Sequence, residues 1–107
     1  MPNIRISFHP AAATEVEAAV RWYAERSLAA ARAFAAKVSS CVHRVEEAPD
    51  RRPHYLNDTR RYLFPHFPHF PFSLVYRSRN EEIEVVAVVH HLRQPGYWRI
   101  QYSEESL

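Results

Sequence analysis

The most strand-like segment of the chain is the run from Ile83 to Val89, which reads IEVVAVV. β-Branched residues occupy both parities of this run, and such residues favour the pleated backbone of a strand. A strand that is apolar on both sides needs both of its faces covered, so the pattern predicts a central strand and not an edge strand. The rest of the chain must therefore supply neighbouring strands and covering layers.

A cluster of polar and aromatic residues follows this run at once, namely His90, His91, Arg93, Tyr97 and Trp98. Such side chains at the end of a rigid strand are a common way to build a binding or catalytic site. Adjacent residues of a strand point to opposite faces, so His90 and His91 are expected on different faces of the sheet. The end of this strand is the predicted functional region.

The length of 107 residues predicts a single domain over 1–107 with one hydrophobic core. No apolar run approaches the roughly 20 residues of a membrane-spanning helix, and the first ten residues lack the pattern of a signal peptide. The lone Cys41 cannot form an internal disulfide, in agreement with a reducing compartment. We therefore expect a cytoplasmic protein that does not bind a membrane.

The first half of the chain shows one strand pattern and two helix patterns. Apolar and polar residues alternate over 4–8, which predicts a short strand with one buried face. Apolar residues at helical spacing predict helices from 11 to about 26 and from 28 to about 47. Ser27 is a suitable N-cap for the second helix, and Pro49 ends it. These patterns predict an αα-hairpin with a short turn.

The second half of the chain is strand-rich. A polar connection over 49–60 leads to a short strand over 61–64. The run PHFPHFP over 65–71 has proline at every third position, a period that favours polyproline II. A half-buried strand over 72–76 and a hairpin turn over 79–81 lead into the central strand. The order β-αα-βββ predicts an α+β fold, with a helical hairpin packed on one face of a mainly antiparallel sheet.

The chain resembles the RelE/ParE family of bacterial toxins from type II toxin–antitoxin systems, and most of all its ParE-like branch. The resemblance rests on five pieces in the family's order: FHPAA (8–12), EAAVRWYAERS (17–27), AFAAKV (33–38), FPFSLVYR (70–77) and AVVHHLRQPGYW (87–98). The last piece contains the His-x-x-Arg element of the branch, here His90 and Arg93. The resemblance implies the same β-αα-βββ fold.

The resemblance also implies a growth inhibitor that forms a hetero-oligomer with a cognate antitoxin, which neutralises it. ParE-like members poison DNA gyrase, whereas RelE-like members cut messenger RNA on the ribosome without a metal. A third alternative is a non-toxic module that only binds its antitoxin. The net charge of +2 gives little long-range attraction for nucleic acid, so we favour a protein target, such as gyrase, over an enzymatic role.

The ribonuclease function and the binding function depend on different candidate residues. A metal-free ribonuclease needs an acid and a base, and cations that stabilise the charge of the phosphorane. Its candidates are His90, Arg93, Tyr97 and Arg61. The candidates for target or antitoxin binding are Trp22, Arg77, His91 and Trp98. Any of these side chains can instead serve packing alone, for example His90 as a hydrogen-bonded histidine at a strand end.

Neither a metal nor another cofactor is expected. His66 and His69 stand three residues apart, but no cysteine or carboxylate lies at ligand spacing beside them. Cys41 lies on the apolar stripe of the second predicted helix, which predicts a buried, unreactive thiol.

Overall fold

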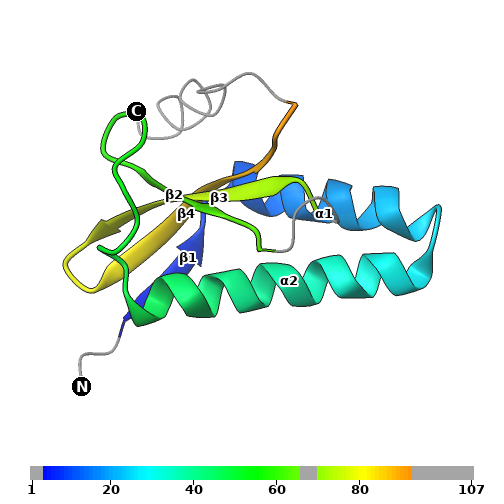
Figure 1. The fold of residues 1–107 in the computed structure, drawn as a ribbon, viewed down its shortest axis with the longest axis horizontal. Coiled ribbons are helices and arrows are strands. Elements are labelled where there is room, and N and C mark those ends of the chain that lie inside the picture. Colours follow the sequence, from blue (N-terminus) through cyan, green and yellow to red (C-terminus); the bar gives the residue numbers. More distant parts are fainter. Residues whose placement is uncertain (1–3, 66–69, 93–107) are drawn as a thin grey trace.

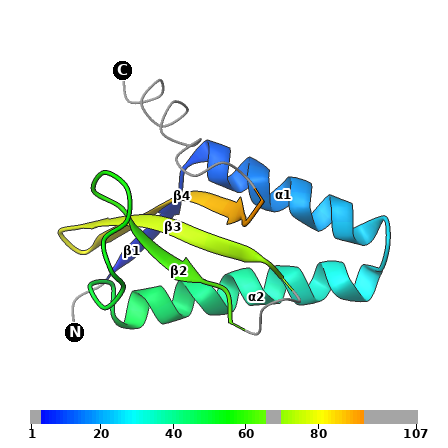
Figure 2. The same cartoon turned by 45° about the horizontal axis from the view of Figure 1, so that its top comes forward.

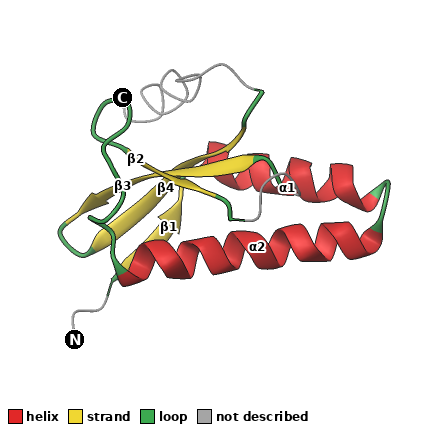
Figure 3. Cartoon of the chain, viewed as in Figure 1, coloured by secondary structure: helices red, strands yellow, loops and turns green. Residues whose placement is uncertain are grey.

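A computed structural model describes residues 4–65 and 70–92. Two helices pack against one four-stranded mixed sheet (Figure 1 and Figure 3). The elements are β1 (Arg5–Phe8), α1 (Pro10–Ala24), α2 (Leu28–Glu47), β2 (Arg60–Leu63), β3 (Phe72–Arg79) and β4 (Glu82–His90). The sheet has the strand order β1-β4-β3-β2. This arrangement confirms the predicted α+β fold. Within the described part of the chain, no helix combines the length and apolarity needed to cross a bilayer.

Strand β4 is central, as its composition predicts. It pairs in parallel with β1 on one side and antiparallel with β3 on the other. The pairing with β1 stops at Val85, because the chain turns into α1 at Pro10. Beyond this point a side chain replaces the missing strand: Glu15 Oε1 accepts a hydrogen bond of 3.0 Å from the Val88 amide. Helix α1 therefore completes the edge of β4.

The pairing of β3 with β4 contains one irregularity. Val75 pairs with Ala87, whereas its neighbour Tyr76 pairs with Val85, so Val86 is an extra residue in β4. An extra residue of this kind is a β-bulge, and it reverses the alternation of side chains along the rest of the strand. The bulge therefore decides which face each residue after Val86 occupies.

The helix-facing side of the sheet holds the main core. Helix α2 contributes an apolar stripe to it, consisting of Phe34, Val38, Cys41 and Val45, and Ala31 is buried on the same helix. Phe34 has no exposed surface, and its ring centroid lies 4.9 Å from that of Phe72 and 5.3 Å from that of Tyr23. Burial raises the pKa of the Cys41 thiol to about 11, in agreement with the predicted unreactive cysteine.

Both helices begin at side-chain caps. The Nδ1 atom of His9 accepts from the Ala11 amide at the start of α1, and the hydroxyl of Ser27 accepts from the Ala30 amide at the start of α2. Helix α1 ends at Ala24, two residues before the end expected from the sequence. The reason is the short turn, because Ser27 must be extended to cap α2.

The opposite side of the sheet, here called the outer face, is covered in part by the connection between α2 and β2. Figure 1 shows α2 on one side of the sheet and this loop on the other, and Figure 2 shows the loop running past the strands. Tyr55 and Leu56 of the loop pack against a small apolar cluster of Val75, Val86, Ala87 and Val89. The polar connection expected from the sequence thus also has two residues with a packing role.

Hydrogen bonds hold this loop in place. The Tyr76 hydroxyl donates to the Pro49 carbonyl at 2.6 Å. The Arg60 guanidinium donates to the carbonyls of Asp50 and Arg52 and forms an ion pair with the Asp50 carboxylate. Two side chains thus satisfy backbone carbonyls of a segment that has no helix or strand of its own.

The hairpin between β3 and β4 has the predicted turn. Asn80 and Glu81 both adopt positive φ angles, 50° and 65°, and Arg79 pairs with Glu82 across them. Two-residue hairpin loops favour this left-handed backbone because it matches the twist of the strands. Most of the proline-rich segment, 66–69 with both of its histidines, lies outside the described residues.

Candidate functional site

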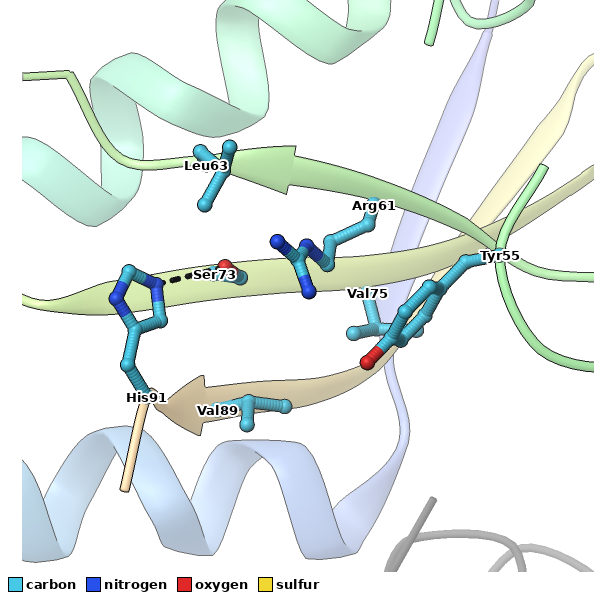
Figure 4. A pocket seen from close by; sticks show the side chains of 7 residues that line it. All are labelled: Tyr55, Arg61, Leu63, Ser73, Val75, Val89 and His91. Atoms are coloured by element: carbon cyan, nitrogen blue, oxygen red, sulfur yellow. Dashed lines mark hydrogen bonds between the residues drawn. The ribbon is translucent and has the colours of Figure 1, made fainter. Parts of the chain in front are cut away.

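A shallow hollow of about 210 Å³ lies on the outer face of the sheet (Figure 4). Strands β2, β3 and β4, the turn after β4 and the loop before β2 supply its walls. The lining residues are Tyr55, Arg61, Leu63, Ser73, Val75, Val89 and His91. We call it the outer-face hollow.

Cross-strand register brings these residues together. Arg61 of β2 lies opposite Val75 of β3, and Leu63 lies opposite Ser73. Ser73 in turn pairs with Val89 of β4. Residues directly opposite each other share a face of the sheet, so all five side chains point to the outer face.

His91 closes one end of the outer-face hollow. Its Nε2 atom lies 2.9 Å from the hydroxyl of Ser73, which is only 1% exposed, and its amide donates to the Pro71 carbonyl. Burial lowers the pKa of the His91 imidazole below its ordinary value, and the nearby charges of Arg61 and His90 act in the same direction. A backbone hydrogen bond at Phe72 opposes them. These effects together favour the neutral form of the imidazole.

Arg61 supplies the positive charge of the outer-face hollow. Figure 4 shows its guanidinium between His91 and Tyr55, and the guanidinium carbon lies 5.0 Å from the centre of the Tyr55 ring. Within 4–65 and 70–92, no carboxylate forms an ion pair with it. A half-buried guanidinium without a counter-ion is suited to receive an anionic group of a ligand.

Arg77, a candidate for partner binding, also lies on the outer face, but nearer the hairpin turn. It forms ion pairs of 3.0 Å with Glu84 and 3.6 Å with Asp58. Arg79 shares the Asp58 carboxylate at 3.4 Å. Arg77 therefore links the two strands to the loop before β2, a structural role that the sequence did not indicate.

His90 lies on the other side of the sheet. Its ring makes an edge-to-face contact with Phe72 at a centroid distance of 5.1 Å, and its Nδ1 atom accepts from the Leu92 amide at 3.1 Å. The expectation that His90 and His91 point to different faces is thus met. His90 and Arg61, both candidates for catalysis, are not brought together, because the sheet separates them.

Trp22, another candidate for partner binding, is 52% exposed near the end of α1. The guanidinium of Arg26 lies over its ring at 3.7 Å and donates to its carbonyl. Leu28, at the start of α2, is also exposed. The tip of the helical hairpin therefore presents apolar surface, and none of its residues lines the outer-face hollow.

The remaining candidates, Arg93, Tyr97 and Trp98, lie outside the described residues. In the part that is described, no three histidine, cysteine or carboxylate side chains are grouped so as to hold a metal ion. The sequence did not single out Tyr55, Leu63 or Ser73. Tyr55 could have been noticed as an aromatic residue inside a polar loop. Leu63 and Ser73 are brought together by strand register, which cannot be read from the sequence.

Comparisons with known proteins agree with the fold. A chain of the "Chromosomal ParDE TA system from P. aeruginosa" superposes with a TM-score of 0.71 at 16% identity, over 84% of this chain and 98% of that chain. No curated protein matches the chain by sequence. The family model described as "ParE toxin of type II toxin-antitoxin system, parDE" matches residues 6–95. Since this match covers most of the sequence, the chain belongs to the ParE toxin family of type II toxin–antitoxin systems.

Proposed function

We propose that this protein arrests bacterial growth by binding a cellular protein target, DNA gyrase, and that a cognate antitoxin neutralises it in a cytoplasmic hetero-oligomer. The family match over residues 6–95 is the observation that carries this proposal. The solved relative belongs to a ParDE toxin–antitoxin system, which supports an antitoxin partner for this chain as well.

The separation of His90 from Arg61 speaks against the catalytic pair expected from the sequence and so supports binding. His90 packs against Phe72 on the helix-facing side, whereas Arg61 lies on the outer face. A general base and a phosphate-binding cation must reach the same substrate atoms to act together. By contrast, the exposed Trp22 and the outer-face hollow offer two separate contact surfaces for proteins.

A metal-free endoribonuclease is the second candidate, and one observation favours it. Arg61 and His91 line the same hollow, and Ser73 orients the imidazole. A neutral imidazole can accept the proton of a ribose 2′-hydroxyl while a guanidinium binds the phosphate. In this ribonuclease mechanism the general base is His91 and not His90.

Inducing the protein in growing cells separates the two mechanisms. A trapped gyrase leaves broken DNA, so we expect growth arrest with an SOS response and intact transcripts. Cut transcripts in phase with codons, without an SOS response, would overturn the proposal in favour of the ribonuclease. Undisturbed growth at a verified protein level would instead show a module that only binds its antitoxin.

Two matched variants sharpen this experiment. His91→Gln removes the imidazole base from the outer-face hollow, and His43→Gln changes a histidine that is 78% exposed on α2. If the protein acts by binding gyrase, neither variant loses the SOS response entirely. If it is a ribonuclease, His91→Gln abolishes transcript cleavage and His43→Gln does not.

A further inference from the structure

The charge partners of Arg61 differ from those of the other arginines on strands β2 and β3. Arg60, Arg77 and Arg79 each have a carboxylate partner within ion-pair distance. Arg61 contacts the Tyr55 ring, and no carboxylate of the described chain pairs with it. Counting only 4–65 and 70–92, the hollow therefore presents one guanidinium without a carboxylate partner, which matches a ligand group with a single negative charge.

The floor of the outer-face hollow is apolar. Val75 is fully buried, Val89 is 9% exposed, and Leu63 forms a rim that is 54% exposed. An aliphatic group placed there would remove the apolar surface of Leu63 from water, which favours binding. The floor thus favours an aliphatic side chain beside the anionic group.

The size of the hollow indicates a part of a larger partner. The outer-face hollow has a volume of about 210 Å³, and a second hollow of about 520 Å³ shares Tyr55, Arg61 and Leu63 with it, so the recessed surface extends beyond one small pocket. One face of Tyr55, the aromatic ring of the hollow, is already covered by the Arg61 guanidinium at 5.0 Å, so that face cannot stack on a nucleobase. An extended recessed surface with this ring face covered fits the side chains of a protein better than a stacked nucleotide.

We propose that the outer-face hollow is an anchor site for an acidic side chain with an aliphatic neighbour, supplied by the antitoxin. Arg61 receives the carboxylate through its two parallel N–H groups, and Leu63, Val75 and Val89 contact the aliphatic neighbour. Small, well-packed pockets of this kind contribute most of the binding energy of many protein interfaces. The choice of the antitoxin as partner rests on the proposed function.

An NMR titration of the purified full-length chain tests the site directly. The probe is the dipeptide N-acetyl-Leu-Glu-amide, and its matched control is N-acetyl-Leu-Gln-amide, which has the same shape without the charge. We expect saturable shifts of the Ser73, Val75 and Val89 amides with the acidic peptide. The neutral peptide should bind at least about tenfold more weakly, the factor that corresponds to about 1.4 kcal/mol.

Variants show whether Arg61 is responsible. Arg61→Gln should weaken binding of the acidic peptide about tenfold, and Arg61→Lys should give an intermediate loss, because lysine keeps the charge but not the planar fork. Arg79→Gln, on the same sheet but outside the hollow, should change nothing. If thermal melting shows that Arg61→Gln does not fold, the binding of the acidic peptide by Arg61→Lys alone tests the role of Arg61.

Three outcomes would overturn the inference: equal binding of both peptides, unchanged binding by the Arg61 variants, or tighter binding of adenosine monophosphate at the same amides. The last outcome would identify a nucleotide-binding site. The titration is independent of toxicity, so a missing SOS response in cells refutes the proposed function without affecting this result.

Discussion

The two faces of the sheet are built in different ways. The helix-facing side is sealed by large side chains, because Phe34 of α2 and Leu74 and Tyr76 of β3 have no exposed surface. The outer face has a smaller cluster of valines under Tyr55 and Leu56, both only partly buried, and next to it the charged outer-face hollow. The first face therefore provides most of the stability, and the second combines modest packing with accessible polar groups. Functional surface is expected where packing is least complete.

The strongest test of this difference is Phe34→Ala, which removes the ring at the centre of the helix-facing core. Buried phenylalanine-to-alanine changes cost about 3–5 kcal/mol, because a cavity remains. We expect a loss of this size in the free energy of unfolding, measured by urea denaturation. A loss below about 1 kcal/mol would mean that this face is not the main source of stability.

The next largest effect is expected where α1 completes the edge of β4. Glu15→Ala removes the acceptor of the Val88 amide and leaves this donor unpaired, at a cost of about 1–3 kcal/mol. Glu15→Gln is the matched control, because its amide oxygen can still accept the bond. Hydrogen exchange at the Val88 amide should accelerate in Glu15→Ala far more than in Glu15→Gln. Equal exchange in both variants would contradict this role of Glu15.

A smaller effect is expected on the outer face. Leu56 is only partly buried against the valine cluster, so Leu56→Ala should lower the unfolding free energy by about 1 kcal/mol, less than the 1.5–3 kcal/mol for a fully buried leucine. The same urea experiment measures it. A loss as large as that of Phe34→Ala would remove the distinction between the two faces.

The smallest effect concerns pH. The pKa of His91 lies below its ordinary value of 6.5, chiefly through burial, so the unfolded chain binds the proton more readily than the folded one. The stability that the neutral His91 side chain contributes to the folded state is fully present above about pH 6.5. It is lost as the pH falls from there through the pKa of His91 in the folded chain. His91→Gln should remove this part of the pH dependence, whereas His43→Gln should retain it. A ring pKa at or above 6.5 in an NMR titration would contradict the assignment.

Local patterns were sufficient for most of the fold. The β-branched run from Ile83 predicted a central strand, and the apolar stripe of α2 with its Ser27 cap predicted the second helix. The turn at Asn80 was also predictable, because asparagine tolerates the left-handed backbone of a tight hairpin. These features depend on neighbours in the sequence, whose propensities and spacing can be read directly.

The candidate site was less predictable. The sequence predicted that His90 and His91 lie on opposite faces, but it did not predict which of the two faces the helices. The bulge at Val86 decides this, since it shifts the alternation by one residue. Without this bulge, His91 would point toward α1 and α2, and His90 would lie on the outer face beside Arg61.

By itself, the sequence determined the helices, the strands, their order along the chain and the family. Only the tertiary structure decided that β1 runs parallel to β4, that Tyr55 and Leu56 cover the outer face, and that Arg61 and His91 share a hollow. The physical reason is that strand register and bulges depend on pairing between distant segments. Single residues such as Val86 can shift that pairing without changing the local propensity of the strand.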